Sequence, residues 1–112
     1  MNIHTYQSSS GRDLIREYID TLTQSEQVDA LSVLECMEKG EFDKIRFKQW
    51  QKRVYEVYFQ KHNRLFYVVS DGENIYLLHA CRKQKNRTEK KDKNIIINRA
   101  KELGKELDMK LI

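Results

Sequence analysis

The fold is decided by one short stretch of the chain, Val54-Tyr55-Glu56-Val57-Tyr58-Phe59. β-Branched and aromatic residues dominate it, as is typical of a strand. Two similar runs follow at Leu65–Val69 and Ile75–Leu78, and short polar segments separate the three runs. The second of these segments contains Asp71-Gly72, a dipeptide that favours a hairpin turn. The sequence therefore predicts three strands that form an antiparallel meander.

Two helices are predicted before these strands. Apolar residues recur at helical spacing from Asp13 to Leu22 and indicate an amphipathic helix. Thr23 followed three residues later by Glu26 predicts a capping box, so a second helix should start there and end before Gly40. The expected apolar face of this second helix consists of Val28, Leu31, Leu34 and Met37. The short turn between the helices predicts a helical hairpin.

The two ends of the chain complete the expected fold. Ile3–Tyr6 is predicted to be a short first strand, and a C-terminal amphipathic helix is marked by Ile96, Ala100, Leu103 and Leu107. The expected fold class is α+β: a small antiparallel sheet with an N-terminal helical hairpin and a C-terminal helix, all helices packing on one face. Residues 1–112 contain no proline, repeat or linker, so we expect a single domain.

Charge is distributed unevenly along the chain, although the net charge is only +4. Residues 44–64 hold seven basic and one acidic side chain, and residues 82–112 hold eleven basic and five acidic ones. Residues 1–43 hold three basic and nine acidic side chains. If the fold brings the two cationic stretches together, they form a positive surface suited to phosphate.

Composition also limits where the protein is expected to act. No run approaches the roughly 20 apolar residues that cross a bilayer, and no signal peptide follows Met1, so we expect a cytoplasmic protein without membrane contact. In that reducing compartment, Cys36 and Cys81 should be buried free thiols. His62, His79 and Cys81 lie in no recognised ligand spacing, so we expect no metal.

Cationic side chains gather at the strand ends and in the loop that follows the last strand. Arg64 opens one strand and His79 closes the next, and the loop then supplies Arg82, Lys83, Lys85 and Arg87. Neighbouring antiparallel strands start and end at the same edge of a sheet, so Arg64 and this loop should converge. Strand alternation places Val54, Glu56 and Tyr58 on one face, which we expect to face solvent or substrate.

An ordered set of short motifs makes the chain similar to a known family. The set consists of Tyr55-Glu56-Val57, Asn63-Arg64-Leu65-Phe66-Tyr67, Leu77-Leu78-His79-Ala80, and Lys83 with Arg87 before a basic helix. It covers about residues 45 to 107 and resembles HigB-type toxins of the RelE/ParE superfamily. The resemblance implies a type II toxin that cleaves messenger RNA, usually on the ribosome and without a metal or other cofactor. It also implies a helix-turn-helix antitoxin as partner.

The resemblance implies roles for individual residues. Arg64 matches a strand arginine that contacts phosphate, Lys83 matches a basic residue that faces the scissile phosphate, and Arg87 matches a later basic position. Fixed cations at these places would stabilise the charge that develops when the 2′-hydroxyl attacks phosphorus. Proton transfer is left open among Glu56, Tyr58, His79 and a lysine whose pKa is lowered by its cationic neighbours. The expected RNA-binding residues are Arg82, Lys85, Arg87, Lys52 and Arg53.

Some positions depart from the family pattern, and two other functions remain open. Tyr58 stands where relatives often have arginine or lysine, Cys81 where many have phenylalanine, and Glu89 where proline is common. A ParE-like toxin shares the fold but inhibits DNA gyrase without a catalytic site. A non-catalytic RNA-binding module of phage or regulatory origin would use the same basic surface only to bind phosphate.

Overall fold

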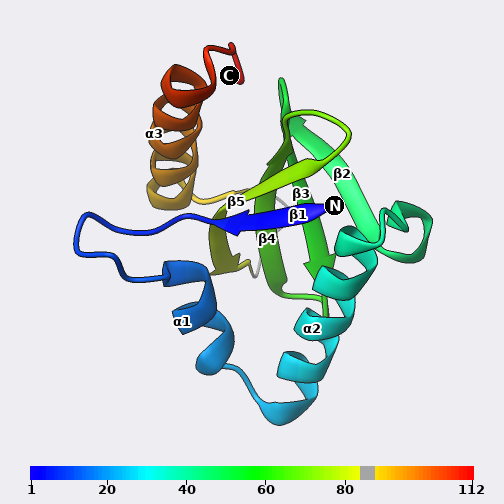
Figure 1. Ribbon diagram of the computed structural model, residues 1–112. Coiled ribbons are helices and arrows are strands. Elements are labelled where there is room, and N and C mark those ends of the chain that lie inside the picture. Colours follow the sequence, from blue (N-terminus) through cyan, green and yellow to red (C-terminus); the bar gives the residue numbers. More distant parts are fainter. Residues whose placement is uncertain (84–87) are drawn as a thin grey trace.

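The computed structural model describes residues 1–83 and 88–112. Within these residues, five strands form one sheet, and helices cover it (Figure 1). The elements in chain order are β1 (Asn2–Thr5), α1 (Leu14–Asp20), α2 (Gln24–Glu38), the short 3-10 helix η1 (Phe42–Lys44), β2 (Arg46–Gln51), β3 (Val54–Phe59), β4 (Asn63–Val69), β5 (Asn74–Arg82) and α3 (Lys90–Leu107). The predicted α+β fold class is confirmed. None of the described helices is both long and apolar enough for a bilayer crossing.

The order of the strands in the sheet is β1-β5-β4-β3-β2. Strands β2 to β5 pair antiparallel in sequence order, as the predicted meander requires, and β1 pairs parallel with β5 at the far edge. Strand β2 was not predicted. Its residues are largely polar and exposed because it forms the other edge of the sheet. Without a buried face, it carries none of the hydrophobic alternation by which a strand is recognised.

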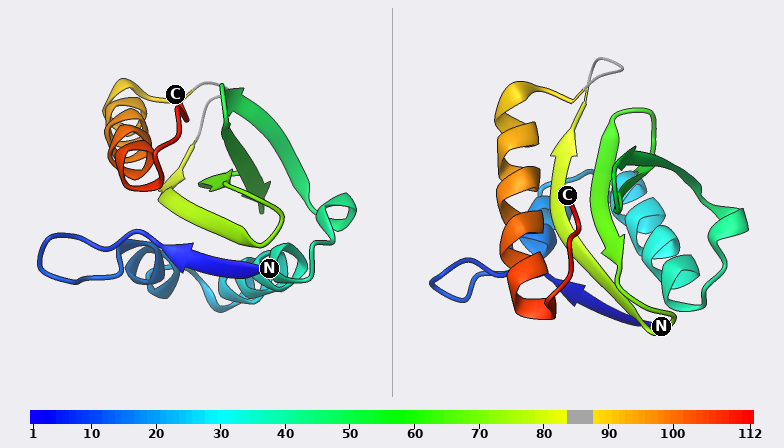
Figure 2. Two further views of the ribbon diagram at one scale, coloured as in Figure 1. Left: turned by 45° about the horizontal axis from the view of Figure 1, so that its top comes forward. Right: turned by 90° about the horizontal axis from the view of Figure 1, so that it is seen from above.

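Helices pack on both faces of the sheet, so the expectation of a single covered face is wrong. Figure 2 shows α1 and α2 on one side of the sheet and α3 on the other. The α1 and α2 side buries Val57, Leu65 and Leu77, whereas the α3 side buries Val54 and Phe66. Apolar side chains of the central strands therefore point to both faces of the sheet, so each face needs helices to cover it.

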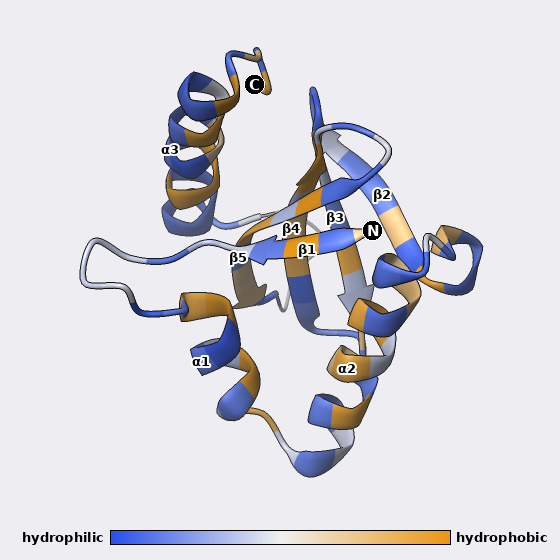
Figure 3. Ribbon diagram, in the orientation of Figure 1, coloured by the Kyte–Doolittle hydropathy of each residue, from blue (hydrophilic) through white to orange (hydrophobic). Residues whose placement is uncertain are grey.

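The second helix begins as predicted but turns a different face to the sheet. The Thr23 hydroxyl accepts a hydrogen bond from the Glu26 backbone at 3.2 Å, and the Thr23 N–H donates to the Glu26 carboxylate at 3.4 Å. The predicted capping box is thus confirmed. Val28 and Leu31, however, are 59% and 62% exposed, and the buried positions of α2 are Glu26, Ala30, Val33 and Met37. Apolar and polar residues alternate around this helix, so the pattern alone does not fix its orientation (Figure 3).

Both cysteines are free within the described residues, as the sequence predicts. Cys81 in β5 is buried, but Cys36 in α2 is only half-buried, so the expectation of two buried thiols is only partly met.

The C-terminal tail turns back over α3 after the helix ends and packs against a glycine of that helix. Asp108 adopts a left-handed conformation with φ of 53°, and the Met109 N–H donates to the Gly104 carbonyl at 2.9 Å. This turn brings Leu111 into the core, where it is 2% exposed. A Cβ atom on Gly104 would lie 2.6 Å from the Met109 carbonyl oxygen, which is too close for any real contact. The tail therefore depends on the absence of a side chain at residue 104.

We expect Gly104→Ala to destabilise the protein, although alanine favours helices more than glycine does. The added methyl meets backbone and forces the tail to shift, which should lower the free energy of unfolding by about 1–3 kcal/mol. Urea unfolding measures this change. The control is Gly72→Ala in the β4–β5 turn, where a Cβ atom meets nothing within 4 Å and should change stability by less than about 0.5 kcal/mol. Equal stability of the two variants would contradict the tail contact.

Candidate functional site

Two rows of side chains cross the sheet on its α3 face. The first row runs from β2 to β5, and each residue lies directly opposite the next: Arg46, Tyr58, Arg64 and Cys81. Directly paired residues point to the same face of a sheet. The second row consists of Lys48, Glu56, Phe66 and His79. Arg64 thus lies beside Cys81 at the end of β5, as predicted, whereas Lys85 and Arg87 of the loop lie outside the described residues.

Arg64 is held in place at the β3–β4 turn. Its Nη1 atom donates to the carbonyl oxygens of Lys61 at 2.8 Å and Asn63 at 3.1 Å. The guanidinium also lies over the Tyr58 ring, 5.0 Å from its centroid. Among the described residues, the Nε and Nη2 atoms of Arg64 make no hydrogen bond. The half-buried side chain is therefore fixed on one side and keeps donors for an anion on the other.

Glu56 of the second row and Lys83, two residues after Cys81 of the first row, form an ion pair. Glu56 is 0% exposed and Lys83 is 4% exposed, and the Lys83 Nζ donates to Glu56 Oε2 at 3.4 Å. The exposed Lys48 places its Nζ 3.2 Å from Oε1, close enough for an ion pair. Its direction does not suit a hydrogen bond, and Oε1 has no hydrogen-bond partner in the described part of the chain. Two ammonium groups thus offset the cost of burying one carboxylate.

The burial of Glu56 corrects an expectation about this face. The row Val54, Glu56 and Tyr58 was predicted to face solvent or substrate, but Val54 and Glu56 are fully buried and only Tyr58 is half-buried. The reason is the second helical layer, because α3 and the C-terminal tail pack over Val54 and Phe66. The part of this face that stays accessible is the end near Tyr58 and Arg64.

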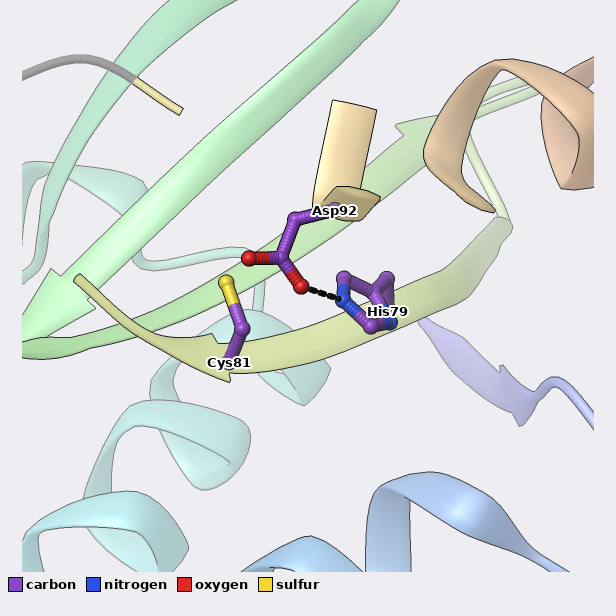
Figure 4. Close-up of side chains that lie close together, drawn as sticks. All are labelled: His79, Cys81 and Asp92. Atoms are coloured by element: carbon purple, nitrogen blue, oxygen red, sulfur yellow. Dashed lines mark hydrogen bonds and ion pairs between the residues drawn. The ribbon is translucent and has the colours of Figure 1, made fainter. Parts of the chain in front are cut away.

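His79 forms a buried pair with a residue of α3. A β-bulge in β5 turns both Leu78 and His79 toward this helix, where the His79 Nε2 lies 2.8 Å from Asp92 Oδ1 (Figure 4). The Arg99 Nη1 lies 3.4 Å from the His79 Nδ1. Arginine can only donate, so Nδ1 accepts and Nε2 carries the proton given to Asp92. Burial lowers the His79 pKa and outweighs the opposing effect of Asp92. Neither ring nitrogen is free to exchange a proton with substrate.

The same region holds three groups whose chemistry could suit a metal. Ligand atoms of His79, Cys81 and Asp92 all lie within 4.8 Å of one another (Figure 4). Their surroundings do not fit a cation. A metal-bound histidine normally donates its other N–H to an acceptor, but here that nitrogen faces the guanidinium of Arg99. Burial raises the pKa of the Cys81 thiol to about 12, which keeps it protonated. We assign the cluster a structural role.

A polar network around Glu26 occupies the opposite face of the sheet. The Glu26 Oε2 accepts from Asn63 Nδ2 at 2.6 Å and from Arg82 Nη2 at 2.8 Å. Tyr18 donates to the Asn63 side chain at 2.5 Å. Hydrogen bonds from Asn63, Thr23 and Arg82 lower the pKa of Glu26 to about 2. Arg82 thus pairs with α2, on the face away from Lys83 and Glu56.

A comparison with protein-family models identifies the group to which the chain belongs. The model of the phage-derived protein Gp49-like family (DUF891) matches residues 17–101, from α1 into α3. The chain is a member of the Gp49-like family. This family is associated with RelE and other toxin-like proteins. No curated protein matches the chain.

The matched region of this Gp49-like protein contains every predicted site residue, but the fold separates them into groups. Tyr58 and Arg64 lie together, and Glu56 with its partner Lys83 lies next to them on the same face. Lys52 and Arg53 lie at the other end of β3, where Arg53 Nη2 donates to the Ser70 carbonyl at 3.5 Å. Arg82 faces α2. The predicted RNA-binding residues Lys85 and Arg87 lie outside the described residues.

Three residues of the Gp49-like site were missed by sequence reasoning. Arg46 and Lys48 belong to the unpredicted strand β2, whose polar sequence gives no strand signal. Asp92 offered one signal, because it precedes Ile96 by four residues and so lies on the apolar face of α3. A carboxylate on that face must find a buried partner, which is His79.

We expect the Glu26 network to make the Gp49-like protein sensitive to acid. The pKa of Glu26 is about 2 in the folded protein and 4.5 ordinarily. Its contribution to stability is therefore complete above about pH 4.5 and is lost as the pH falls toward 2. Urea unfolding at a series of pH values should show this loss in the wild type and a flatter profile in Glu26→Gln.

The control variant is Glu35→Gln, which changes an exposed carboxylate of the same helix that pairs with Lys39. It should keep the acid transition of the wild type, since an exposed pair contributes little. An unchanged acid transition in Glu26→Gln would show that Glu26 does not govern it.

Proposed function

We propose that the protein is a HigB-type toxin of a type II toxin–antitoxin system, acting as a metal-independent endoribonuclease on messenger RNA. The observation that carries the proposal is the accessible pair of Tyr58 and Arg64, with the buried Glu56–Lys83 ion pair next to it on the same face of the sheet. Membership in a family associated with toxin-like proteins supports it. In this proposal the toxin acts in the cytoplasm on ribosome-bound RNA, and a cognate helix-turn-helix antitoxin neutralises it.

The proposed reaction needs no cofactor, because RNA supplies its own nucleophile. The 2′-oxygen attacks phosphorus, its proton passes to water, and the bond from phosphorus to the 5′ oxygen breaks. The free donors of Arg64 meet the negative charge that develops on the phosphate oxygens. Tyr58, half-buried beside Arg64, donates a proton to the departing 5′ oxygen.

The buried residues next to this pair have positioning roles in the proposal. Lys83 adds positive charge near the reacting phosphate, and Glu56 holds Lys83 and Lys48 in place. His79 is not assigned to proton transfer, because both of its ring nitrogens face partners on α3. This division revises the expectation that Lys83 touches the phosphate directly.

A non-catalytic RNA-binding module is the second candidate function. The observation that favours it is the burial of Lys83, whose side chain is only 2% exposed. A surface that only binds phosphate does not need Lys83 as a second cation at the reacting phosphorus, so the burial of Lys83 is compatible with binding alone. The fixed position of Arg64 favours catalysis instead, since preorganised donors are what stabilise a transition state.

Induced expression tests the toxin activity. We expect the chain expressed alone to arrest growth, the adjacent antitoxin gene to restore it, and mapping of RNA 5′ ends to show new cuts within coding regions. The matched control is Arg64→Ala, which should express equally well and leave growth unimpaired. Normal growth with wild-type protein that is verified as soluble would count against the toxin. Arrest without new 5′ ends would favour the non-catalytic module.

Single-turnover cleavage at saturating enzyme separates catalysis from binding. Arg64→Ala should cut about a hundredfold more slowly, because one preorganised donor to a developing oxyanion contributes roughly 3 kcal/mol. Tyr58→Phe keeps the ring under Arg64 and removes only the phenol, so it should lose a similar factor.

The control for both variants is Lys101→Ala, an exposed change on α3 that should leave the saturated rate unaltered. If Arg64→Ala cuts as fast as the wild type at saturation, Arg64 only binds RNA and the catalytic assignment is wrong.

A further inference from the structure

A groove opens beside the proposed site where strand β2 begins. Its volume is about 460 Å³. Strand β3 extends one residue beyond its last pairing with β2, and α2 borders the open space that results. The groove is lined by Ser32, Val33, Cys36, Lys44, Ile45, Arg46, Tyr58, Phe59, Gln60, Lys61 and Arg64. It is thus continuous with the Tyr58–Arg64 pair.

Unpaired positive charge converges on this groove. Arg46 and Lys61 are both exposed, and neither forms a hydrogen bond or ion pair through its side chain with the described residues. Lys44 also lines the groove, but Glu41 already neutralises it. The nearby Glu35 pairs with Lys39. Within the described part of the chain, the free cations of the groove are therefore Arg46 and Lys61, with Arg64 at its inner end.

Two of these cations flank one aromatic ring, and the third lies in the turn that holds Arg64. Arg46 lies directly opposite Tyr58 on one side, and Arg64 lies opposite it on the other. Lys61 has a left-handed backbone with φ of 62°, and its carbonyl accepts the hydrogen bond that fixes Arg64. Arg46 and Lys61 therefore line the same groove as Arg64, the groove through which a ligand would reach Arg64 from this side.

We propose that the groove binds a second phosphate of single-stranded RNA, next to the phosphate at Arg64, with Arg46 and Lys61 as its ligands. This inference rests on the proposed function and assigns the path of the RNA chain. The planar guanidinium of Arg46 suits two phosphate oxygens, and the flexible ammonium of Lys61 supplies a point charge. The RNA then crosses the β3–β4 turn and stays away from Lys52 and Arg53 at the other end of β3.

Binding of an RNA that cannot be cut tests the groove independently of catalysis. The probe is a fluorescent single-stranded RNA with 2′-O-methyl groups throughout, which removes the attacking hydroxyls. Its Kd is measured by anisotropy over a series of salt concentrations. The double variant Arg46→Gln/Lys61→Gln should weaken binding about tenfold and reduce the slope of log K against log salt by about 1.4, or roughly 0.7 for each cation removed.

The matched control is Lys110→Gln, which removes one exposed charge from the C-terminal tail, outside the lining of the groove, and should leave the Kd and slope near the wild-type values. At saturating enzyme, the double variant should also cut RNA at nearly the wild-type rate.

If the wild type binds the probe and the double variant keeps its affinity and slope, the groove proposal is overturned, while the proposed function stands. If the wild type cuts RNA but does not bind the probe in a salt-dependent way, the groove proposal fails as well. If the wild type neither binds nor cuts RNA, the proposed function itself is wrong.

Discussion

The buried carboxylate of Glu26 is the interaction on which the rest of the structure depends. It completes the cap of α2 through Thr23, and it accepts hydrogen bonds from Asn63 of β4 and Arg82 of β5. Asn63 in turn accepts from Tyr18 of α1. One side chain therefore fixes both N-terminal helices against two strands. A carboxylate buried this deeply persists only because several donors replace its lost hydration.

The same network helps to position the proposed site from the opposite face of the sheet. Asn63 and Arg82 are the immediate neighbours of Arg64 and Lys83 along the chain, and alternation turns each neighbour to the opposite face. The sheet thus separates a structural polar network under α2 from the cations near α3. Ordering the first network fixes the strand ends on which the second group stands, and the Asn63 carbonyl accepts a hydrogen bond from Arg64 directly.

Sequence reasoning succeeded where a local pattern was sufficient. The three apolar strands, the Thr23 cap and the convergence of Arg64 with the end of β5 follow from composition, spacing and antiparallel geometry. It failed where tertiary packing decides which side chains are buried and which of them pair. Val28 and Leu31 were expected on the buried face of α2, but the partners of Glu26 set the rotation of that helix. The ion pair of Glu56 and Lys83 joins residues 27 positions apart and leaves no local pattern.

Strand β2 also has a consequence for how the protein avoids self-association. An edge strand exposes unpaired backbone groups that can template pairing with another chain. Here the edge carries the charges of Arg46 and Lys48, and an irregularity in register between Gln49 and Gln51 interrupts its regular geometry. The cations that we assign to RNA and to Glu56 thus also act as gatekeepers against aggregation. Selection on solubility would therefore preserve positive charge on this edge whether or not the edge binds RNA.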